Sequence, residues 1–321
     1  MKLSYFLSAL SVAVLSYLPA SAEVIFTDSL DAEGSWTVNG TADTAYEFGY
    51  DYSADGIPEA PNSVGGAATT GLKLQANMSA GAANIVAASP GLSLSGKYTV
   101  QFDMWINANG PFPGGGGGST EFIGGAVGHD GTTAGVDGAS FLASGEGGSS
   151  SDWRLYKEGA WLDYDSSSPE ITATYGPLVT GDNSASDPFV TEFPGVAPPA
   201  LQQANFAQQT GSTQDGAAGF QWLTVLVTAD ADAGTAKFDI TSELGGSVTL
   251  GTIDASIGDT VSTEGDLALL YADLFSSVSD NAALSFGVFD NVVVNTVPEP
   301  SSVVMLLAAA AGTVLAYRRS C

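Results

Sequence analysis

One short loop places oxygen-bearing side chains at the spacing of a calcium site. Asp51, Ser53 and Asp55 stand at positions 1, 3 and 5 of a segment whose sixth residue is Gly56. A loop of the EF-hand type wraps Ca2+ with oxygens at these positions, and its glycine makes the sharp turn. Position 12 is Asn62, so the bidentate glutamate of such loops is missing. The segment predicts a Ca2+ site, and a polar loop without a ligand is the alternative.

Carbohydrate binding is the second chemistry that the residue types allow. Four aromatic residues fall within twelve positions, beside charged side chains: Trp153, Tyr156, Trp161 and Tyr164. Aromatic rings can stack on pyranose rings while carboxylates and amides fix the hydroxyl groups. Trp105 is a further candidate, because it alternates with the apolar residues of its segment and should be exposed. Packing in the hydrophobic core is the competing interpretation for each ring.

Histidine and cysteine are too scarce for most catalytic or metal-binding clusters. The chain holds one of each, His129 and Cys321. It therefore has no Cys-His pair, no zinc cluster and no internal disulfide. His129 lies in the sequence Gly-His-Asp-Gly, whose composition predicts a solvated turn. We expect a protein without enzymatic activity; a polysaccharide hydrolase or lyase, which needs only two carboxylates, is the lesser alternative.

The charge and the composition exclude other classes of protein. The 321 residues include 35 acidic and 8 basic side chains, for a formal net charge of -27. Such a field repels the phosphates of nucleic acids, so no nucleic-acid partner is expected. Charged residues make up only 13% of the chain and glycine supplies 40 positions. This composition argues against a helix-rich protein and favours strands joined by turns.

Alternating apolar and polar residues predict an all-β body. The clearest strand is Lys97 to Ile106, in which every second residue is apolar. Further strands are predicted at Val24 to Phe26, Ala45 to Tyr50, Leu72 to Gln75, Asn84 to Ala87, Phe122 to Val127, Trp153 to Tyr156, Trp222 to Thr228, Lys237 to Thr241, Val248 to Ile253 and Leu284 to Val294. One helix is predicted at Asp266 to Phe275, where the leucines follow a helical period.

Two long segments interrupt the predicted strands. Gly110 to Ser119 contains five consecutive glycines, and its low bulk predicts a flexible loop that does not pack. Asp163 to Ala218 is rich in Ser, Pro, Gln and Ala and predicts a long excursion between strands. It is expected to act either as a ligand-facing loop or as an insertion without a role.

The closing strands resemble those of concanavalin A-like, laminin-G-like jelly rolls. The resemblance rests on Phe220 to Thr228, Thr235 to Ile240 and Phe286 to Val294, and it extends to Val24 to Asp28 and Tyr98 to Trp105. It implies a jelly-roll β-sandwich over residues 23–297, with long Gly/Pro-rich loops. The Glu-x-Asp-x-x-Glu strand of laminarinase-type hydrolases on this fold is absent from the sequence.

The jelly-roll resemblance also suggests a second cation site. The first and last strands of such folds often lie side by side. Asp28 closes the first predicted strand and Asp290 lies within the last one. A cation between these carboxylates would join the two ends of the domain, so we expect Asp28 and Asp290 to be a second candidate pair for Ca2+.

Both ends of the chain carry targeting signals. Residues 1–22 contain Lys2, an apolar stretch and Ala20-Ser21-Ala22, which together predict a cleaved secretory signal peptide. At the other end, residues 302–317 form an apolar run of about 16 residues, near the lower limit of ~17 for a membrane-spanning helix. The basic residues Arg318 and Arg319 follow it and favour a cytoplasmic C-terminus.

The C-terminal end resembles the PEP-CTERM sorting signal of certain Gram-negative bacteria. Pro298, Glu299 and Pro300 precede the apolar run, and the arginines follow it. The resemblance covers residues 298–321 and implies recognition by an exosortase, transient anchoring in the inner membrane and release to the outer surface or the extracellular matrix. A plain tail anchor is the alternative. We therefore expect an exported envelope or matrix protein that binds or embeds in exopolysaccharide, with a purely structural matrix protein as the alternative.

Overall fold

The computed structural model describes residues 22–63, 69–79, 81–148, 151–162, 188–254 and 260–297. The predicted sorting signal at 298–321 lies outside these residues, as do Tyr164 and all of the predicted signal peptide except Ala22. Within the described ranges, no helix has the length and apolar character that crossing a membrane requires.

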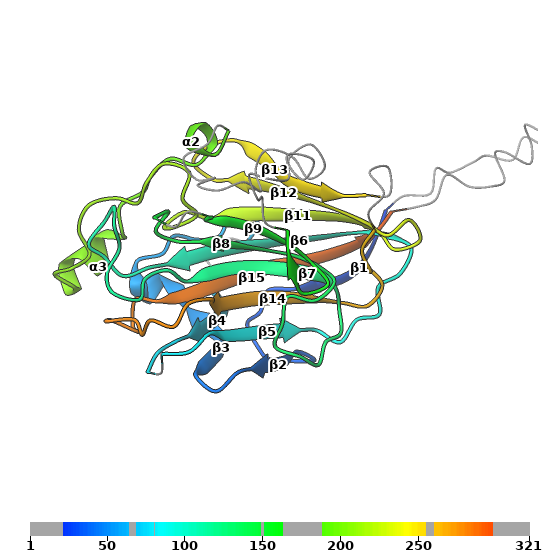
Figure 1. Ribbon diagram of the computed structural model, residues 1–321, viewed down its shortest axis with the longest axis horizontal. Coiled ribbons are helices and arrows are strands. Elements are labelled where there is room, and N and C mark those ends of the chain that lie inside the picture. The colour runs from blue at the N-terminus through cyan, green and yellow to red at the C-terminus, as the bar shows by residue number, and fades with distance from the viewer. Residues whose placement is uncertain are drawn as a thin grey trace, which may run out of the picture. The chain divides into compact units, whose positions relative to one another are not determined.

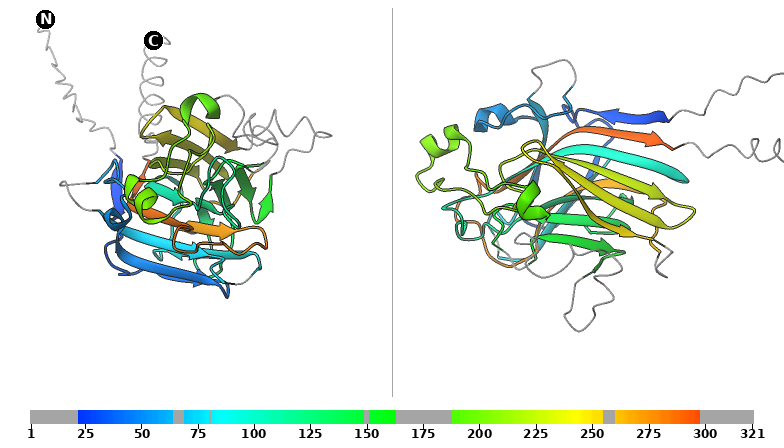
Figure 2. Two further views of the ribbon diagram at one scale, coloured as in Figure 1. Left: turned by 90° about the vertical axis from the view of Figure 1, so that its left-hand side faces the viewer. Right: turned by 90° about the horizontal axis from the view of Figure 1, so that it is seen from above.

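Eight antiparallel strands form the larger sheet (Figure 1). Their order is β13 (Ser247–Ile253), β12 (Thr235–Ser242), β11 (Leu223–Asp230), β6 (Lys97–Asn107), β15 (Phe286–Thr296), β4 (Thr70–Ala76) and β3 (Thr44–Asp51), with β1 (Glu23–Asp28) paired to β15 off this path. The first and last strands thus lie side by side, as predicted. Figure 2 shows β1 in blue along β15 in orange in its right-hand view.

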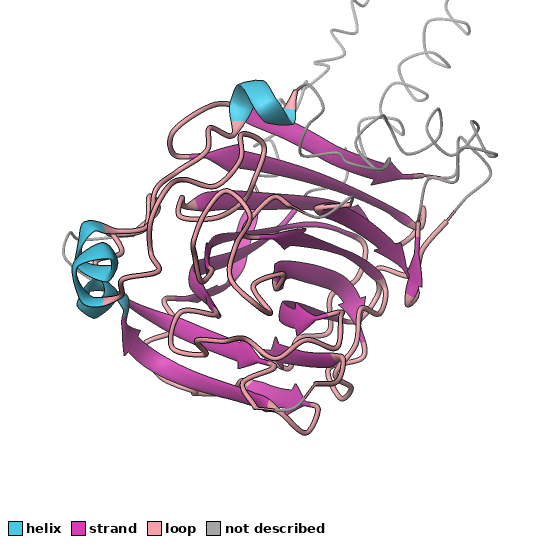
Figure 3. Cartoon of the chain, turned by 60° about the vertical axis from the view of Figure 1, so that its left-hand side comes forward, coloured by secondary structure: helices cyan, strands magenta, loops and turns pink. Residues whose placement is uncertain are grey.

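Seven antiparallel strands form the second sheet. Their order is β10 (Ala160–Trp161), β9 (Trp153–Lys157), β8 (Ala139–Ser144), β7 (Phe122–His129), β14 (Asp266–Asp273), β5 (Asn84–Ser89) and β2 (Thr37–Gly40). Short helices occur only at η1 (Tyr52–Asp55), α2 (Phe189–Glu192) and α3 (Ala200–Asn205) within the described ranges, as Figure 3 shows. The predicted all-β jelly-roll sandwich is confirmed.

Every predicted strand is present to within two residues at each end, but the predicted helix is wrong. Residues Asp266–Asp273 form β14, which pairs with β7 on one side and β5 on the other. Leu267 and Leu269 face the core between the sheets, while Ala268 and Leu270 lie in an apolar layer on the opposite face. A strand buried on both faces is apolar at nearly every position, so a helical spacing can be found in it by chance.

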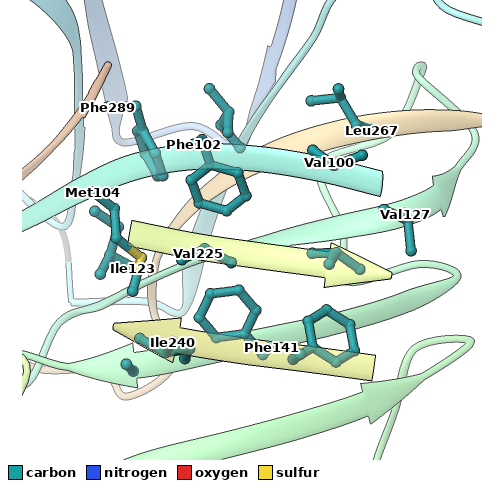
Figure 4. Packing of buried hydrophobic residues seen from close by; sticks show 14 of the residues in the cluster. Val100, Phe102, Met104, Ile123, Val127, Phe141, Val225, Ile240, Leu267 and Phe289 are labelled. Atoms are coloured by element: carbon teal, nitrogen blue, oxygen red, sulfur yellow. The ribbon is translucent and has the colours of Figure 1, made fainter. Parts of the chain in front are cut away.

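The main core lies between the two sheets (Figure 4). Val100, Phe102 and Met104 project from β6 into this core, as the alternating pattern predicts. They meet residues of the second sheet such as Ile123 and Phe141. The interior is therefore filled by side chains of both sheets, and the polar residues of β6 face away from it.

A second apolar layer covers part of the outer face of the larger sheet. Trp105 and Trp222 lie there beside Tyr52, Phe220 and Phe286, and all five side chains are buried. The segments after β3 and before β11 supply Tyr52 and Phe220. The prediction that Trp105 is exposed is therefore wrong, because these two segments cover the face of the sheet to which its side chain points.

The glycine-rich segment at 110–119 also departs from its prediction, because it packs. The Gly116 N–H donates to the Asn109 carbonyl at 2.8 Å, and the Gly117 N–H donates to the Asp280 carboxylate at 3.0 Å. At Gly118, φ is +64°, and a Cβ atom would collide with the backbone of Val278. The glycines are needed here because two backbone segments approach too closely for side chains.

Candidate functional site

One edge of β15 changes its neighbour halfway along the strand. Gly287–Phe289 pair with β4, whereas Val292–Thr296 pair with β1. Asp290 and Asn291 lie between these two pairings. On the other edge, Asp290 faces Asp103 and Val293 faces Gln101, so β15 has one extra residue and forms a β-bulge. Asn291 adopts a left-handed conformation at φ 56° to accommodate it.

A recess with a volume of about 650 Å³ opens where the neighbour changes. We call it the acidic recess. Three carboxylates and three amides line it, together with small hydroxyl and apolar side chains: Thr27, Asp28, Ser29, Asp31, Asn62, Ser63, Gln101, Asp290, Asn291, Val292 and Val293. Its volume falls within the range of small-molecule sites. The structure thus brings Asp28 and Asp290 to one recess, as expected from the pairing of the first and last strands, and a cation between them stays a prediction.

Asp290 is the most buried acid of the recess, with 1% of its surface exposed. Its Oδ2 accepts a hydrogen bond from the Tyr52 hydroxyl at 3.0 Å, and its Oδ1 accepts one from the Asn291 N–H at 2.7 Å. Burial, together with the nearby charges of Asp103 and Asp31, raises the pKa of Asp290 to about 7. The acid can therefore change its protonation state near neutral pH.

Asp103 lies opposite Asp290 and organises the floor of the recess. Its carboxylate accepts four hydrogen bonds, from Asn62 N–H and Nδ2 at 3.1 and 2.6 Å, from Thr224 Oγ1 at 2.7 Å and from Asn291 Nδ2 at 2.9 Å. The residue is fully buried and does not line the recess. Asp103 is thus a positioning residue that fixes the two amides.

The turn after β1 supplies the other two carboxylates. Asp28 accepts hydrogen bonds from the Leu30 N–H at 2.7 Å and from Trp36 Nε1 at 3.0 Å. Asp31 accepts hydrogen bonds from the hydroxyls of Ser29, at 2.7 Å, and Thr70. These bonds hold both side chains in place before any ligand arrives. Carboxylate and amide groups fixed in this way can accept from and donate to several hydroxyl groups of one ligand.

The predicted calcium loop has the expected turn but its acids already have partners. Gly56 has φ +74°, as a sharp turn at this position requires. Asp51 Oδ1 accepts hydrogen bonds from the Ser53 N–H at 3.1 Å, from Ser53 Oγ at 2.6 Å and from Thr69 Oγ1 at 3.0 Å. Asp55 accepts one from the Tyr50 hydroxyl. Within the described ranges, Asp51, Ser53 and Asp55 therefore form a capped turn, and a Ca2+ site there stays a prediction.

The predicted aromatic cluster does not form one exposed face. Trp153 and Tyr156 are buried. Trp153 stacks on Phe189 at a ring-centre distance of 4.8 Å and donates Nε1–H to the Gly216 carbonyl at 2.9 Å. An exposed sugar platform at these two rings is excluded, because residues of the long segment before β11 cover Trp153. Tyr164 lies outside the described residues.

Among the predicted ligand residues that the structure describes, Trp161 stays accessible, with 36% of its surface exposed. The Arg154 guanidinium lies 4.4 Å from the centre of its ring and 4.6 Å from that of Phe122. The planar cation supports one face of Trp161 through a cation-π contact. This small patch on the second sheet is the remaining aromatic candidate for a ligand contact.

His129 is not the solvated turn residue that the sequence predicts. It ends β7 and its side chain is buried. Its Nδ1 accepts a hydrogen bond from the Gly131 N–H at 2.9 Å. Among the described residues, His129, Asp130 and Asp137 form the one trio of potential metal ligands whose atoms all lie within 4.8 Å of one another. Asp130 Oδ1 accepts hydrogen bonds from the Thr132 and Thr133 N–H groups at 2.7 and 2.9 Å.

Sequence reasoning missed the amides and one acid of the recess. Asn62, Asn291 and Asp31 received no role, although Asp290 and Asn291 are adjacent. A polar pair inside an otherwise apolar last strand is the signal that could have indicated a bulge. The approach of Asn62 depends on how the segment after β3 folds back over the sheet, which no local pattern encodes.

The fold and the recess define a two-sheet antiparallel β-sandwich with an acidic, amide-lined recess on the outer face of its larger sheet.

No family model matches the sequence, and no curated protein matches it. A Bacillus subtilis protein of unknown function with a galectin-like fold has 11% sequence identity and a TM-score of 0.41, covering 87% of this chain and 100% of that one. Peanut lectin with a 9mer peptide has 8% identity and a TM-score of 0.36, covering 87% and 100%. A Bauhinia forficata lectin in complex with GalNAc has 9% identity and a TM-score of 0.33, covering 86% and 99%.

Proposed function

We propose that the chain is a non-enzymatic glycan-binding protein whose acidic recess binds the hydroxyl groups of a polysaccharide. The observation that carries the proposal is the recess itself, in which Asp31, Asn62 and Asn291 are held by hydrogen bonds to the chain. Donors and acceptors that are fixed before binding lose little conformational freedom when a ligand arrives. The volume of the recess, about 650 Å³, falls within the range of small-molecule sites.

The arrangement of the acids favours binding over hydrolysis. Glycosidases place two carboxylates on opposite sides of a sugar that reaches both. Asp103 and Asp290 are neighbours, but Asp103 lies beneath the recess and its carboxylate accepts four hydrogen bonds. A substrate in the recess would meet Asp28, Asp31 and Asp290, and not Asp103. Asp28 and Asp31 already accept hydrogen bonds from the chain, which supports a protein that holds a glycan without cleaving it.

The place of action is proposed from the two ends of the sequence. Residues 1–22 have the features of a secretory signal, and residues 298–321 resemble a PEP-CTERM signal. We infer that the chain is exported, passes through an inner-membrane stage with residues 302–317 in the bilayer, and is processed by an exosortase. Exopolysaccharide at the cell envelope or in the matrix is then the partner that the recess would meet.

Affinity electrophoresis through gels that contain a panel of soluble polysaccharides tests the proposed function. We expect selective retardation of the full-length protein by one or two glycans. Asn62→Ala removes an exposed amide from the recess and should abolish the retardation, whereas Glu47→Gln, at an exposed position of β3, should leave it unchanged. Equal mobility of the folded protein in every gel would contradict glycan binding and favour the purely structural alternative.

A further inference from the structure

Buried polar atoms without a partner are concentrated at one end of the sandwich. Among the described residues, ten buried side-chain nitrogen or oxygen atoms lack a hydrogen-bond partner. Seven of these ten belong to five residues, which we call the end cluster: Asn77, Glu121, Glu146, Tyr271 and Asp273. Folded proteins rarely leave such atoms unpaired, and a concentration of them indicates an ion or water that belongs to the site.

The strand pairing explains why these residues lie together. β8 and β14 both pair antiparallel with β7, so both end where β7 begins (Figure 1). Glu121 immediately precedes β7, and Asp273 is the last residue of β14. Ala272 pairs with Phe122, which places Asp273 and Glu121 one position further along the same ladder. Tyr271 and Asp273 are two residues apart in β14 and therefore point to the same face, toward the core.

Glu121 is the centre of the end cluster. It is fully buried, and neither of its carboxylate oxygens has a partner. Burial, together with the charges of Asp273, Glu146 and Asp43, raises the pKa of Glu121 to about 9. Burial also raises the pKa of Tyr271 well above its usual value, with the charges of Glu121 and Asp273 as the next causes. The charges of these acids therefore act on the Tyr271 hydroxyl.

Two non-acidic residues at this end of the sandwich also have buried polar atoms without a partner. The Tyr271 hydroxyl is buried without a partner, as are both polar side-chain atoms of Asn77. Asn77 follows β4 in the opposite sheet, and its carbonyl accepts from the Ser279 N–H, six residues beyond Asp273. The Asn77 N–H donates to the carbonyl of Asp43, whose charge acts on Glu121. Neutral oxygens of a tyrosine and an asparagine complement carboxylates as ligands for a hard cation.

We propose that a hard divalent cation of the Ca2+ class binds in the end cluster, held by Glu121 and Asp273 with the oxygens of Asn77 and Tyr271. Asp273 Oδ1 accepts the Phe275 N–H at 2.7 Å, which leaves Oδ2 for the cation. Among the described residues, only the His129 trio brings ligand atoms of three His, Cys, Asp or Glu side chains within 4.8 Å of one another. We therefore assign direct contact to two acids, and Glu146 contributes its charge from a greater distance.

The cation removes an energetic conflict that the fold otherwise contains. Carboxylates buried close together without a counter-ion repel one another and lose their hydration. A divalent cation supplies the missing positive charge and gives the unpartnered oxygens of Glu121, Asp273, Asn77 and Tyr271 ligand bonds. The glycine-rich segment closes over this end, because a Cβ atom at Gly115 would meet the side chains of Ser119 and Glu146. The site therefore belongs to the folded interior and is distinct from the acidic recess.

Thermal unfolding of the full-length protein after chelator treatment tests the proposal, with CaCl2 added back. We expect saturating Ca2+ to raise the melting temperature of the wild type by roughly 5–10 °C. The double variant Glu121→Gln/Asp273→Asn should lose this shift. The matched control Asp130→Asn/Asp137→Asn also removes two carboxylates, in this case from the His129 trio. This control should keep the Ca2+-induced rise in melting temperature. The Ca2+-induced rise in melting temperature of the wild type does not depend on glycan binding. The result of this test is therefore independent of whether the proposed glycan-binding function is correct.

A second measurement keeps the proposal testable if the double variant does not fold. Tb3+ replaces Ca2+ and emits light when a nearby aromatic ring transfers energy to it. We expect sensitised Tb3+ emission that Ca2+ competes away and that Tyr271→Phe reduces, because this variant lacks both the oxygen ligand and the phenol ring that transfers energy. The single variant Glu121→Gln keeps the side-chain volume and should weaken Ca2+ binding at least 10-fold. No stabilisation of the wild type by Ca2+, or an equal shift in Glu121→Gln, would overturn the proposal.

Discussion

Asp103 and Asp290 face each other across β6 and β15, and both are buried, yet their carboxylates differ in hydrogen bonding. Asp103 accepts four hydrogen bonds, two from Asn62, one from Asn291 and one from Thr224. Asp290 accepts one from Tyr52 and one from Asn291, and burial raises its pKa to about 7. The first acid builds the recess and the second one lines it.

Asparagine in place of each acid should therefore have unequal effects on stability. Asp103→Asn places an amide N–H₂ against donor groups, and we expect it to lower the free energy of unfolding by roughly 3 kcal/mol. Asp290→Asn removes a buried carboxyl group whose pKa is already raised. We therefore expect the free energy of unfolding to change by no more than about 1 kcal/mol at pH 8. Denaturant unfolding of both variants measures the difference. Equal losses would contradict the separate roles of the two acids.

The buried aromatic rings should affect stability and not ligand binding. Trp153 is stacked on Phe189 and Phe193, so we expect Trp153→Ala to lower the free energy of unfolding by about 3–5 kcal/mol. Trp161→Ala, at an exposed site, should cost less than about 1 kcal/mol and leave glycan retardation intact. Loss of retardation in Trp161→Ala would move the binding site from the recess to the Arg154 patch.

The pH dependence of stability should reflect the buried acids of the cation-free protein. Burial raises the pKa of Glu121 to about 9, of Glu146 to about 7 and of Asp273 to about 6. Between about pH 5 and pH 9 the folded chain thus binds more protons than the unfolded chain, whose acids have pKa values near 4. The free energy of unfolding must fall as the pH rises through this window.

Thermal unfolding of chelator-treated protein between pH 5 and pH 9 checks this sign. We expect the highest melting temperature near pH 5 and a steady decrease toward pH 9. Glu121→Gln should flatten the upper part of the decrease, because the group with the highest of these pKa values no longer titrates. A melting temperature that rises with pH would contradict the burial of unpaired acids.

The sequence predicted the strands well because their alternating residues reflect a local constraint. Segments such as Lys97–Asn107 bury one face between the sheets, and that periodicity is visible without knowledge of the partners. The helix predicted at Asp266 failed because β14 is buried on both faces. Trp105 was expected at the surface because alternation shows which face of a strand a residue occupies, and not what covers that face.

The candidate site was predictable only in part. The proximity of Asp28 and Asp290 followed from the expected pairing of the first and last strands, which β1 and β15 confirm. The contribution of Asn62 to the acidic recess depends on contacts between residues far apart in the chain. The same holds for the contribution of Glu121 to the end cluster. Such contacts leave no periodic trace in the sequence.

The central claim is that the acidic recess holds a glycan, and titration calorimetry tests it most directly. The polysaccharide that retards the protein, cut to a defined oligosaccharide, is titrated into wild type, Asp31→Asn and the control Glu47→Gln. Asp31→Asn keeps the shape of the recess but removes charge-assisted hydrogen bonds worth about 1.5–3 kcal/mol. We predict saturable binding at one site per chain, weakened at least ~10-fold in Asp31→Asn and unchanged in Glu47→Gln. Equal affinity in all three proteins, or no saturable binding to the wild type, would contradict the account.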